Sequence, residues 1–293
     1  MYSAEINNKQ PALLVLLIDQ SFSMLESWAE TEQSKAAALA AAVNNLLGNA
    51  VALCSRGEEE VNGYFDIGVL GYGQTVGPVL NGTDTEQVVA SIQHVADNPL
   101  RLDTVTRRVP DGAGGVVARQ QLMPIWLDAA ANGATPMTAA FTAIEPVVQS
   151  WCAAHTSSFP PIVINVTDGM STDGQPREVV NRIRQLGTDD GKALVFNLHL
   201  SGIPSQPVRF PASAAGLTDP NAAMLYDLSS ELPPAILEAA AALHYPVEPH
   251  ARGFLYNADA ATVIDFLDIG TRSVTPTGLR ELTAGDSEDG TAG

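Results

Sequence analysis

The chain has 293 residues, 45% of them hydrophobic, which is enough for one large domain with a substantial core. Its 33 acidic and 15 basic residues give a formal charge of −18 at pH 7. A chain this acidic repels phosphate backbones and anionic lipid, which disfavours binding to nucleic acid or to a membrane surface. Excess acid can attract cations or a basic partner, and it is also a simple means of solubility.

The two cysteines and the N-terminal residues bear on the compartment. Cys54 and Cys152 fall in predicted helices with apolar neighbours, so we expect buried free thiols rather than a disulfide. Residues 1–10 lack the basic segment that opens a signal peptide, and the apolar run after them is too short to span a membrane. We therefore expect a soluble, cytoplasmic protein.

Several apolar runs predict buried strands. Residues 1–10 are polar and are expected to form a loose arm. The unbroken apolar run Ala12–Ile18 is typical of the central strand of a parallel sheet, buried on both faces. A short antiparallel edge strand is expected at Thr75–Leu80. The other predicted strands are Tyr64–Tyr72, Ile162–Thr167, Ala193–Leu200 and Gly253–Tyr256.

Helices are predicted where apolar residues recur at spacings of three and four. They cover residues 34–52, 85–96, 136–154, 176–186, 233–244 and 259–268. Residues 99–127, which contain VPDGAGG, are expected to form an irregular excursion near the ligand end of the sheet.

The alternation of strands and helices indicates the fold class. It predicts an α/β, Rossmann-like, doubly wound and mostly parallel central sheet with one antiparallel edge strand and helices on both faces. The expected organisation is an arm at 1–10, one domain at 11–272 and an acidic, disordered tail at 273–293.

Oxygen-bearing side chains follow two of the predicted strands and precede one helix. Asp19, Ser21 and Ser23 follow the first strand, Asp168 follows Ile162–Thr167, and Thr135 stands before the helix at 136. Ligands of open α/β sheets bind at the carboxyl ends of the strands. Two carboxylates and three hydroxyls suit a hard cation, Mg²⁺ or alternatively Mn²⁺ or Ca²⁺. Because two acids give such an ion less negative charge than a closed, multi-carboxylate site would, water or an Asp or Glu carboxylate from a partner protein would complete its shell.

These motifs carry a family resemblance. DQSFS, GATPM and VTDGMSTDG together resemble the metal-ion-dependent adhesion site of the von Willebrand factor type A family, over most of 12–270. The resemblance implies that Asp19, Ser21, Ser23, Thr135 and Asp168 are metal ligands. It also implies Mg²⁺-assisted protein binding, with no nucleotide and no catalysis. VTDGMSTDG is similar to the bacterial, intracellular TerY-like branch associated with stress-response systems, whereas Phe22 stands where many members have Gly.

Simpler interpretations of the same residues remain open. Asp19 and the serines could cap a strand end, Thr135 could only cap its helix, and Asp168 could only form a turn. Asp173 could be an outer ligand, although a solvated loop acid is the simpler interpretation. Phe22 and Trp28 could form an apolar rim, or Trp28 could belong to the core. The five histidines show no spacing typical of a zinc site.

Two other functions compete with a protein-binding module. One is a metal-dependent phosphoesterase that uses Asp19 as nucleophile or ligand. Against it, Ser21 replaces the second acid of the Asp-x-Asp motif, and no basic residue near the motifs is placed to hold phosphate. The other is a regulatory subunit of a MoxR-type or chelatase-type AAA+ ATPase, which is also a binding role.

Overall fold

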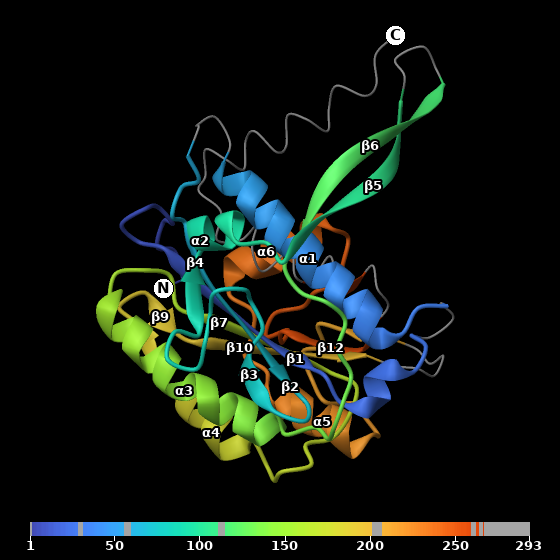
Figure 1. The fold of residues 1–293 in the computed structure, drawn as a ribbon. Helices are drawn as coiled ribbons and strands as arrows, with labels where there is room; N and C mark the ends of the chain where they lie inside the picture. The colour runs from blue at the N-terminus through green and yellow to red at the C-terminus, as the bar shows by residue number, and fades with distance from the viewer. Residues whose placement is uncertain are drawn as a thin grey trace.

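The computed structural model describes residues 2–28, 32–55, 60–110, 115–200, 207–258, 262, 263 and 266. Its centre is an eight-stranded sheet with the order β11-β12-β10-β7-β1-β2-β3, and β4 also pairs with β2 (Figure 1). The strands are β1 (Ala12–Asp19), β2 (Phe65–Tyr72), β3 (Val76–Pro78), β4 (Val89–Ser91), β7 (Ile162–Thr167), β10 (Leu194–Leu200), β11 (Val208–Arg209) and β12 (Phe254–Ala258).

The strand β1 lies at the centre of the sheet. Its first seven residues are apolar, which favours burial on both faces, and its last residue is Asp19. It pairs in parallel with β2 and β7, and all eight of its residues are buried. The parallel core continues through β10 to β12. Among the described residues of this sheet, the antiparallel pairs lie at its margins, where β3 and β4 pair with β2 and β11 pairs with β12. The predicted mostly parallel sheet with an antiparallel edge is confirmed.

Helices cover both faces of the sheet (Figure 1). The helices α1 (Lys35–Cys54), α2 (Ile92–Asp97) and α6 (Pro234–Ala242) cover one face of the sheet. Their apolar residues share a core with Leu14 and Leu16 of β1. The helices α3 (Met137–Ala154), α4 (Arg177–Ile183) and α5 (Pro220–Leu228) pack on the other, together with Leu13, Val15 and Leu17. Successive side chains of a strand point to opposite faces, so this one apolar strand supplies both cores.

The predicted helix at 85–96 is half wrong. Residues Val89–Ser91 form β4, which pairs antiparallel with Asp66–Gly68. The helix α2 begins only after Ser91, whose hydroxyl accepts a hydrogen bond from the backbone N–H of His94 at 3.3 Å. For Val89–Ser91, hydrogen bonding to one end of β2 therefore outweighs the helical spacing of the apolar residues.

The predicted irregular segment at 99–127 is a β-ribbon. It consists of β5 (Arg101–Pro110) and β6 (Val116–Ile125), which pair antiparallel over ten positions and project from the body (Figure 1). The foot of the ribbon lies beside the middle of α1, where the Trp126 backbone N–H donates to Asn44 Oδ1 at 2.8 Å. Polar and apolar residues do not alternate along either strand, which hid both strands from a pattern-based prediction.

The N-terminal arm is not loose. The backbone N–H groups of Ser3 and Ala4 donate to Asp190 Oδ2 at 2.8 and 3.0 Å, and the Tyr2 hydroxyl donates to the Lys192 carbonyl at 3.2 Å. The arm is thereby fixed to the hairpin of β8 (Gly187–Thr188) and β9 (Gly191–Lys192). The tail at 273–293 lies outside the described residues.

The helix α5 was not predicted, although its start carries a recognisable signal. Asp219 accepts hydrogen bonds from the backbone N–H groups of Asn221 and Ala222 at 2.7 and 3.3 Å, and Pro220 occupies the first turn. An Asp cap followed by Pro is a common helix beginning. Both cysteines are buried free thiols, as predicted.

Among the described residues, α1 is long and apolar enough to cross a membrane by length and composition. Half of the apolar window is buried inside the protein. Core helices of globular domains pass the same test, and the buried face of α1 packs on the sheet through Leu39, Val43 and Leu46.

Candidate metal-binding site

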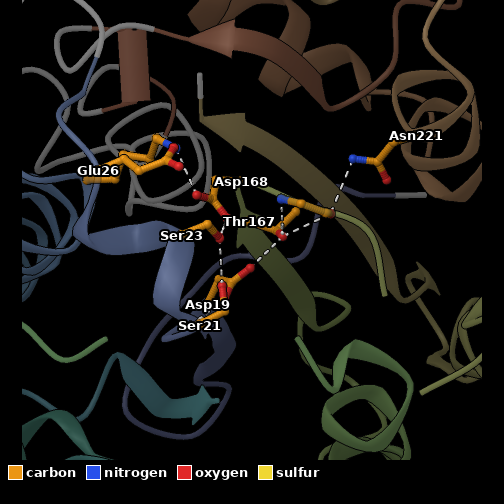
Figure 2. A network of polar contacts seen from close by, with 9 residues as sticks. Asp19, Ser21, Ser23, Glu26, Thr167, Asp168 and Asn221 are labelled. Atoms are coloured by element: carbon orange, nitrogen blue, oxygen red, sulfur yellow. Dashed lines mark hydrogen bonds and ion pairs between the residues drawn. The ribbon is translucent and has the colours of Figure 1, made fainter. Parts of the chain in front are cut away.

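The predicted site residues meet at the carboxyl edge of the sheet. Asp19 is the last residue of β1, and Asp168 follows the last residue of β7, the strand beside it. Ser21 and Ser23 lie in the turn after β1, where Phe22–Leu25 forms a 3₁₀ helix. Figure 2 shows these side chains turned toward one another.

A continuous chain of hydrogen bonds joins four of the five residues. Asp19 Oδ1 accepts from the Ser21 backbone N–H at 2.8 Å, and the two serine hydroxyl oxygens are 3.0 Å apart. The Ser23 hydroxyl then donates to Asp168 Oδ1 at 2.7 Å. Residues 145 positions apart in the chain are thus held in direct contact. The structure brings Asp19, Ser21, Ser23 and Asp168 together as predicted.

Thr135 borders the same cluster through the turn after β7. Its backbone N–H donates to the Thr172 hydroxyl at 3.1 Å, and the Thr172 N–H donates to the Thr135 carbonyl at 2.9 Å. A Cβ added at Gly169 would lie 4.0 Å from Thr135 Oγ1. Thr135 makes no side-chain cap on α3, so its expected capping role is wrong and its hydroxyl stands beside the residue that follows Asp168.

Asp19 is a buried acid without a basic partner among the described side chains. Its exposed fraction is 1%, and its other oxygen, Oδ2, accepts a hydrogen bond from the Thr167 hydroxyl at 2.7 Å. Burial raises the pKa of Asp19 to about 6, and the hydrogen bonds from Ser21 and Thr167 only partly offset this. A cation beside Asp19 would remove this penalty.

Lys35, at the start of α1, is the feature that sequence reasoning missed. Its ammonium group donates to Asp168 Oδ2 at 2.8 Å and to Glu26 Oε2 at 2.9 Å. The side chains of Lys35 and Asp168 are 4% and 0% exposed. Burial opposes the charge, but the bonds to Asp168 and Glu26 outweigh it and raise the pKa of Lys35. From the sequence we expect no basic residue placed to hold phosphate; Lys35 lies at the site, but both of its ion pairs are with carboxylates of this chain.

A second layer of polar side chains supports the turn after β7. Asn221 Nδ2 donates to the Gly169 carbonyl at 3.2 Å (Figure 2). His199, at the end of β10, is buried and stacks on Tyr256 with ring centroids 4.5 Å apart. Burial lowers the pKa of His199, which favours the neutral imidazole. Asn221 could have been predicted to support this turn only if the helix α5 had been recognised in the sequence.

Three of the large apolar side chains that are exposed among the described residues border this site. Phe22 and Leu25 are 64% and 61% exposed, and they lie three residues apart in the 3₁₀ helix, a spacing at which side chains eclipse. Met170, two residues after Asp168, is 62% exposed. Trp28 is 1% exposed and belongs to the core. The apolar rim therefore contains Phe22 but not Trp28.

Asp173 caps α3 from across the site. Its carboxylate accepts hydrogen bonds from the backbone N–H groups of Thr138 and Ala139 at 3.0 and 2.8 Å. Burial opposes ionisation, yet hydrogen bonds from Ser171 and from Ala139 and Thr138 outweigh it and lower the pKa of Asp173. Asp173 is an exposed loop acid, as the simpler interpretation expects, and it caps α3 in addition.

The Asp173 cap gives a stability prediction. Asp173→Ala removes the acceptor for two N–H groups of the first turn of α3, and lost caps cost about 1 kcal/mol. We expect the free energy of unfolding in urea to fall by about that amount at pH 7. Glu238→Ala, which removes an exposed acid from α6, serves as the control, and an equal loss in both variants would contradict a cap on α3.

The donor set fits a hard divalent cation. Two carboxylates and three hydroxyls, on β1, on the loop before α3 and after β7, all carry the oxygen ligands that such ions prefer. No cluster of three His, Cys, Asp or Glu side chains suited to a metal occurs in the described part of the chain. A cation here would therefore depend on the hydroxyls as well as on the two acids.

Comparisons with known proteins find similarity only among solved structures. No protein-family profile matches the chain, and no curated protein does. Proximal thread matrix protein 1 from the mussel byssus aligns over 78% of this chain at 15% identity, with a TM-score of 0.38. One structure of that protein has a zinc-occupied MIDAS motif and aligns with a TM-score of 0.37. The pilus adhesin SpaC of Lactobacillus rhamnosus GG aligns over 92% of this chain at 13% identity, with a TM-score of 0.45.

The chain spans less than half the length of these structures, 43% of the first and 31% of the adhesin. The architecture of this chain is given by its own sheet, with parallel β1, β2, β7, β10 and β12 at the centre.

Proposed function

We propose that the protein is a von Willebrand factor type A-like binding module that holds a divalent cation, Mg²⁺ by preference, at Asp19, Ser21, Ser23, Thr135 and Asp168. One observation supports this proposal most directly. Asp19 is buried, is joined to Asp168 through Ser21 and Ser23, and has no basic partner among the side chains that the structure describes. A cation in contact with both carboxylates would supply the missing charge.

We propose that the cation's remaining ligand comes from a partner protein, as an Asp or Glu carboxylate. Two acids neutralise a divalent ion formally, but Asp168 also shares its charge with Lys35, which leaves the ion attractive to an external anion. The exposed side chains of Phe22, Leu25 and Met170 would contact apolar groups beside that carboxylate. A cytoplasmic, bacterial stress-response setting rests on the resemblance to the TerY-like branch.

We also propose that the module has no catalytic activity of its own. The phosphoesterase alternative needs a basic group free to hold phosphate, and Lys35 is already paired with two carboxylates in a buried position. Phosphatase turnover with Mg²⁺ that disappears in Asp19→Ala would contradict this view.

Thermal unfolding with and without metal tests the proposal. A ligand of the folded state at one hundred times its dissociation constant stabilises by about 2.7 kcal/mol, which corresponds to a Tm rise of about 5–10 °C in a chain of this size. We expect Mg²⁺ or Mn²⁺ to raise the Tm of the wild-type protein, and Ser21→Ala and Asp19→Asn to abolish the shift.

Asp128→Asn provides the matched control for that experiment. Asp128 is an exposed acid that pairs with Arg101 and lines the same small cavity as Asp19, but it is none of the five proposed ligands, so its loss changes the net charge equally. A metal shift of the same size in Asp19→Asn and Asp128→Asn would mean that the cation binds elsewhere. No shift in the wild-type protein at millimolar metal would contradict an ion site at these residues.

A further inference from the structure

Lys35 places a fixed positive charge beside the proposed cation site. Its ammonium group lies 2.8 Å from Asp168 Oδ2 and 2.9 Å from Glu26 Oε2, and its side chain is 4% exposed. Its backbone is fixed as well, because the Lys35 N–H donates to the Glu26 carbonyl at 2.9 Å and α1 begins at Lys35, directly after the Ser34 cap. A lysine in the first turn opposes the helix dipole, so the two carboxylates, and not α1, stabilise the charge at this position.

The carboxylate of Asp168 is divided between Lys35 and the proposed metal ligands. Its Oδ2 accepts from Lys35, whereas its Oδ1 accepts from the Ser23 hydroxyl at 2.7 Å. A hydroxyl has one proton and two lone pairs, so Ser23 can donate to Asp168 and still offer its oxygen to a cation. Figure 2 shows Glu26 and Asp19 on opposite sides of Asp168. A cation held by Asp19 and the serines would therefore share the Asp168 carboxylate with the ammonium group of Lys35.

Two cations that share a buried carboxylate repel each other. The Asp168 side chain is 0% exposed, and charges held away from water are screened little by solvent or salt. At pH 7.5 the acids Asp19, Asp168 and Glu26 carry three negative charges and Lys35 one positive charge, so the net charge of this cluster is −2. Without Lys35 it would be −3, and with a neutral residue in place of Glu26 it would be −1. A divalent cation should bind more tightly in the first case and more weakly in the second.

We propose that Lys35 sets the affinity of the site for its divalent cation by competing with the cation for Asp168, and that Glu26 adjusts this competition from the surface. This inference rests on the proposed cation site. The Glu26 side chain is 67% exposed, so it draws Lys35 away from Asp168 only in part. The competition keeps the ion short of negative charge, which is the condition under which it accepts a carboxylate from another protein.

Calorimetric titration of the whole protein with Mn²⁺ at pH 7.5 tests this inference. We expect Lys35→Met to lower the Mn²⁺ dissociation constant about tenfold or more, and Glu26→Gln to raise it about threefold. The effect of Glu26→Gln should disappear when Lys35 is also replaced by Met, because Glu26 acts through the lysine.

Lys192→Met and Glu86→Gln are the matched controls, because each makes the same change of charge as one test variant. Both side chains are exposed. Lys192 ends β9 just before β10 begins, and Glu86 precedes β4, which pairs with the amino end of β2, so both lie toward the edge of the sheet opposite the site. We expect either control to change the dissociation constant by less than about twofold.

Lys35→Met removes the partner of a buried acid, so its folding is checked by circular dichroism with and without Mn²⁺. If it folds in neither condition, Glu26→Gln decides, because an exposed side chain can be replaced without loss of the fold. An unchanged dissociation constant in either folded test variant would overturn the inference but not the cation site, and weaker binding in Lys35→Met would do the same. The absence of Mn²⁺ binding from the wild type and every variant would overturn the proposed function together with the inference.

Discussion

Replacing Asp19 by Asn should make the metal-free protein more stable at neutral pH. Burial raises the pKa of this carboxyl from its ordinary 3.8 to about 6, so its ionised form is destabilised in the folded protein. One pKa unit corresponds to about 1.4 kcal/mol, which makes the penalty about 3 kcal/mol above pH 6. Asn removes the charge and keeps the shape of the side chain.

The hydrogen bonds around Asp19 accommodate the change. The Asn oxygen can still accept from the Ser21 N–H, and its amide N–H can donate to Thr167 Oγ1. The Thr167 hydroxyl then donates to the Gly169 carbonyl, which already lies 3.2 Å away. The substitution therefore keeps both hydrogen bonds of this side chain, and only the second N–H of the new amide lacks an acceptor here.

The sign of the pH dependence follows from proton binding. Between pH 4 and about pH 6 the folded protein holds a proton on Asp19 that the unfolded chain has lost. Wild-type stability in a chelator should therefore fall by about 3 kcal/mol as the pH rises through this range. In Asp19→Asn this component of the pH dependence should be absent.

Urea unfolding from pH 4 to pH 8, with chelator and with Mg²⁺, measures both effects. With Mg²⁺ the wild type should be more stable than Asp19→Asn, because only the wild type is stabilised by the bound ion. Asp168→Asn is the informative comparison, since removing that partner of Lys35 should destabilise the protein under either condition. An Asp19→Asn variant that is less stable than the wild type in chelator would contradict the unpaired-acid interpretation.

Replacing Lys35 by Met should cost about 3–5 kcal/mol of unfolding free energy. The Asp168 side chain is fully buried, and Lys35 is its basic partner. Breaking a buried ion pair by removing one member leaves the other charge without compensation, which is the costly case. The Met side chain replaces the aliphatic stem of the lysine, so the lost charge dominates the effect.

A double-mutant cycle isolates the pair. Lys35→Met combined with Asp168→Asn removes both charges, and we expect it to recover a large part of the loss seen in either single variant. Lys192→Met, which removes an exposed lysine bonded to a backbone carbonyl, should change stability by about 0.5 kcal/mol or less. Equal losses in Lys35→Met and Lys192→Met would show that the buried pair contributes nothing.

The central sheet could be predicted because its signals are local. The apolar run of β1 and the mostly apolar β7 and β10 can be buried only between two layers of helices. The secondary-structure predictions were wrong where pairing with another strand outweighed the local pattern of apolar residues. Residues Val89–Ser91 became a strand because one end of β2 was free, and residues 99–127 became a ribbon without apolar alternation.

The polar interior of the sheet could not be predicted from the apolar runs. The Tyr72 hydroxyl donates to Asn165 Oδ1 at 2.7 Å, and Asn165 Nδ2 donates to Asn197 Oδ1 at 3.0 Å. Asn197 Nδ2 continues to the Ser229 hydroxyl at 3.0 Å. These residues lie on β2, β7, β10 and after α5, so their partners are distant in the chain, and each amide is acceptable in the core only because the next one satisfies it.

The sequence by itself determined that Asp19, Ser21, Ser23 and Asp168 would meet, because strand ends in a parallel sheet share one edge whatever the loops do. Only the tertiary structure decided the charge balance there. Lys35 lies 133 residues from Asp168, and Asp173 lies 35 from the N–H group of Thr138 that it caps. Apolar periodicity is local and specifies elements, whereas ion pairs and distant caps depend on which elements pack side by side.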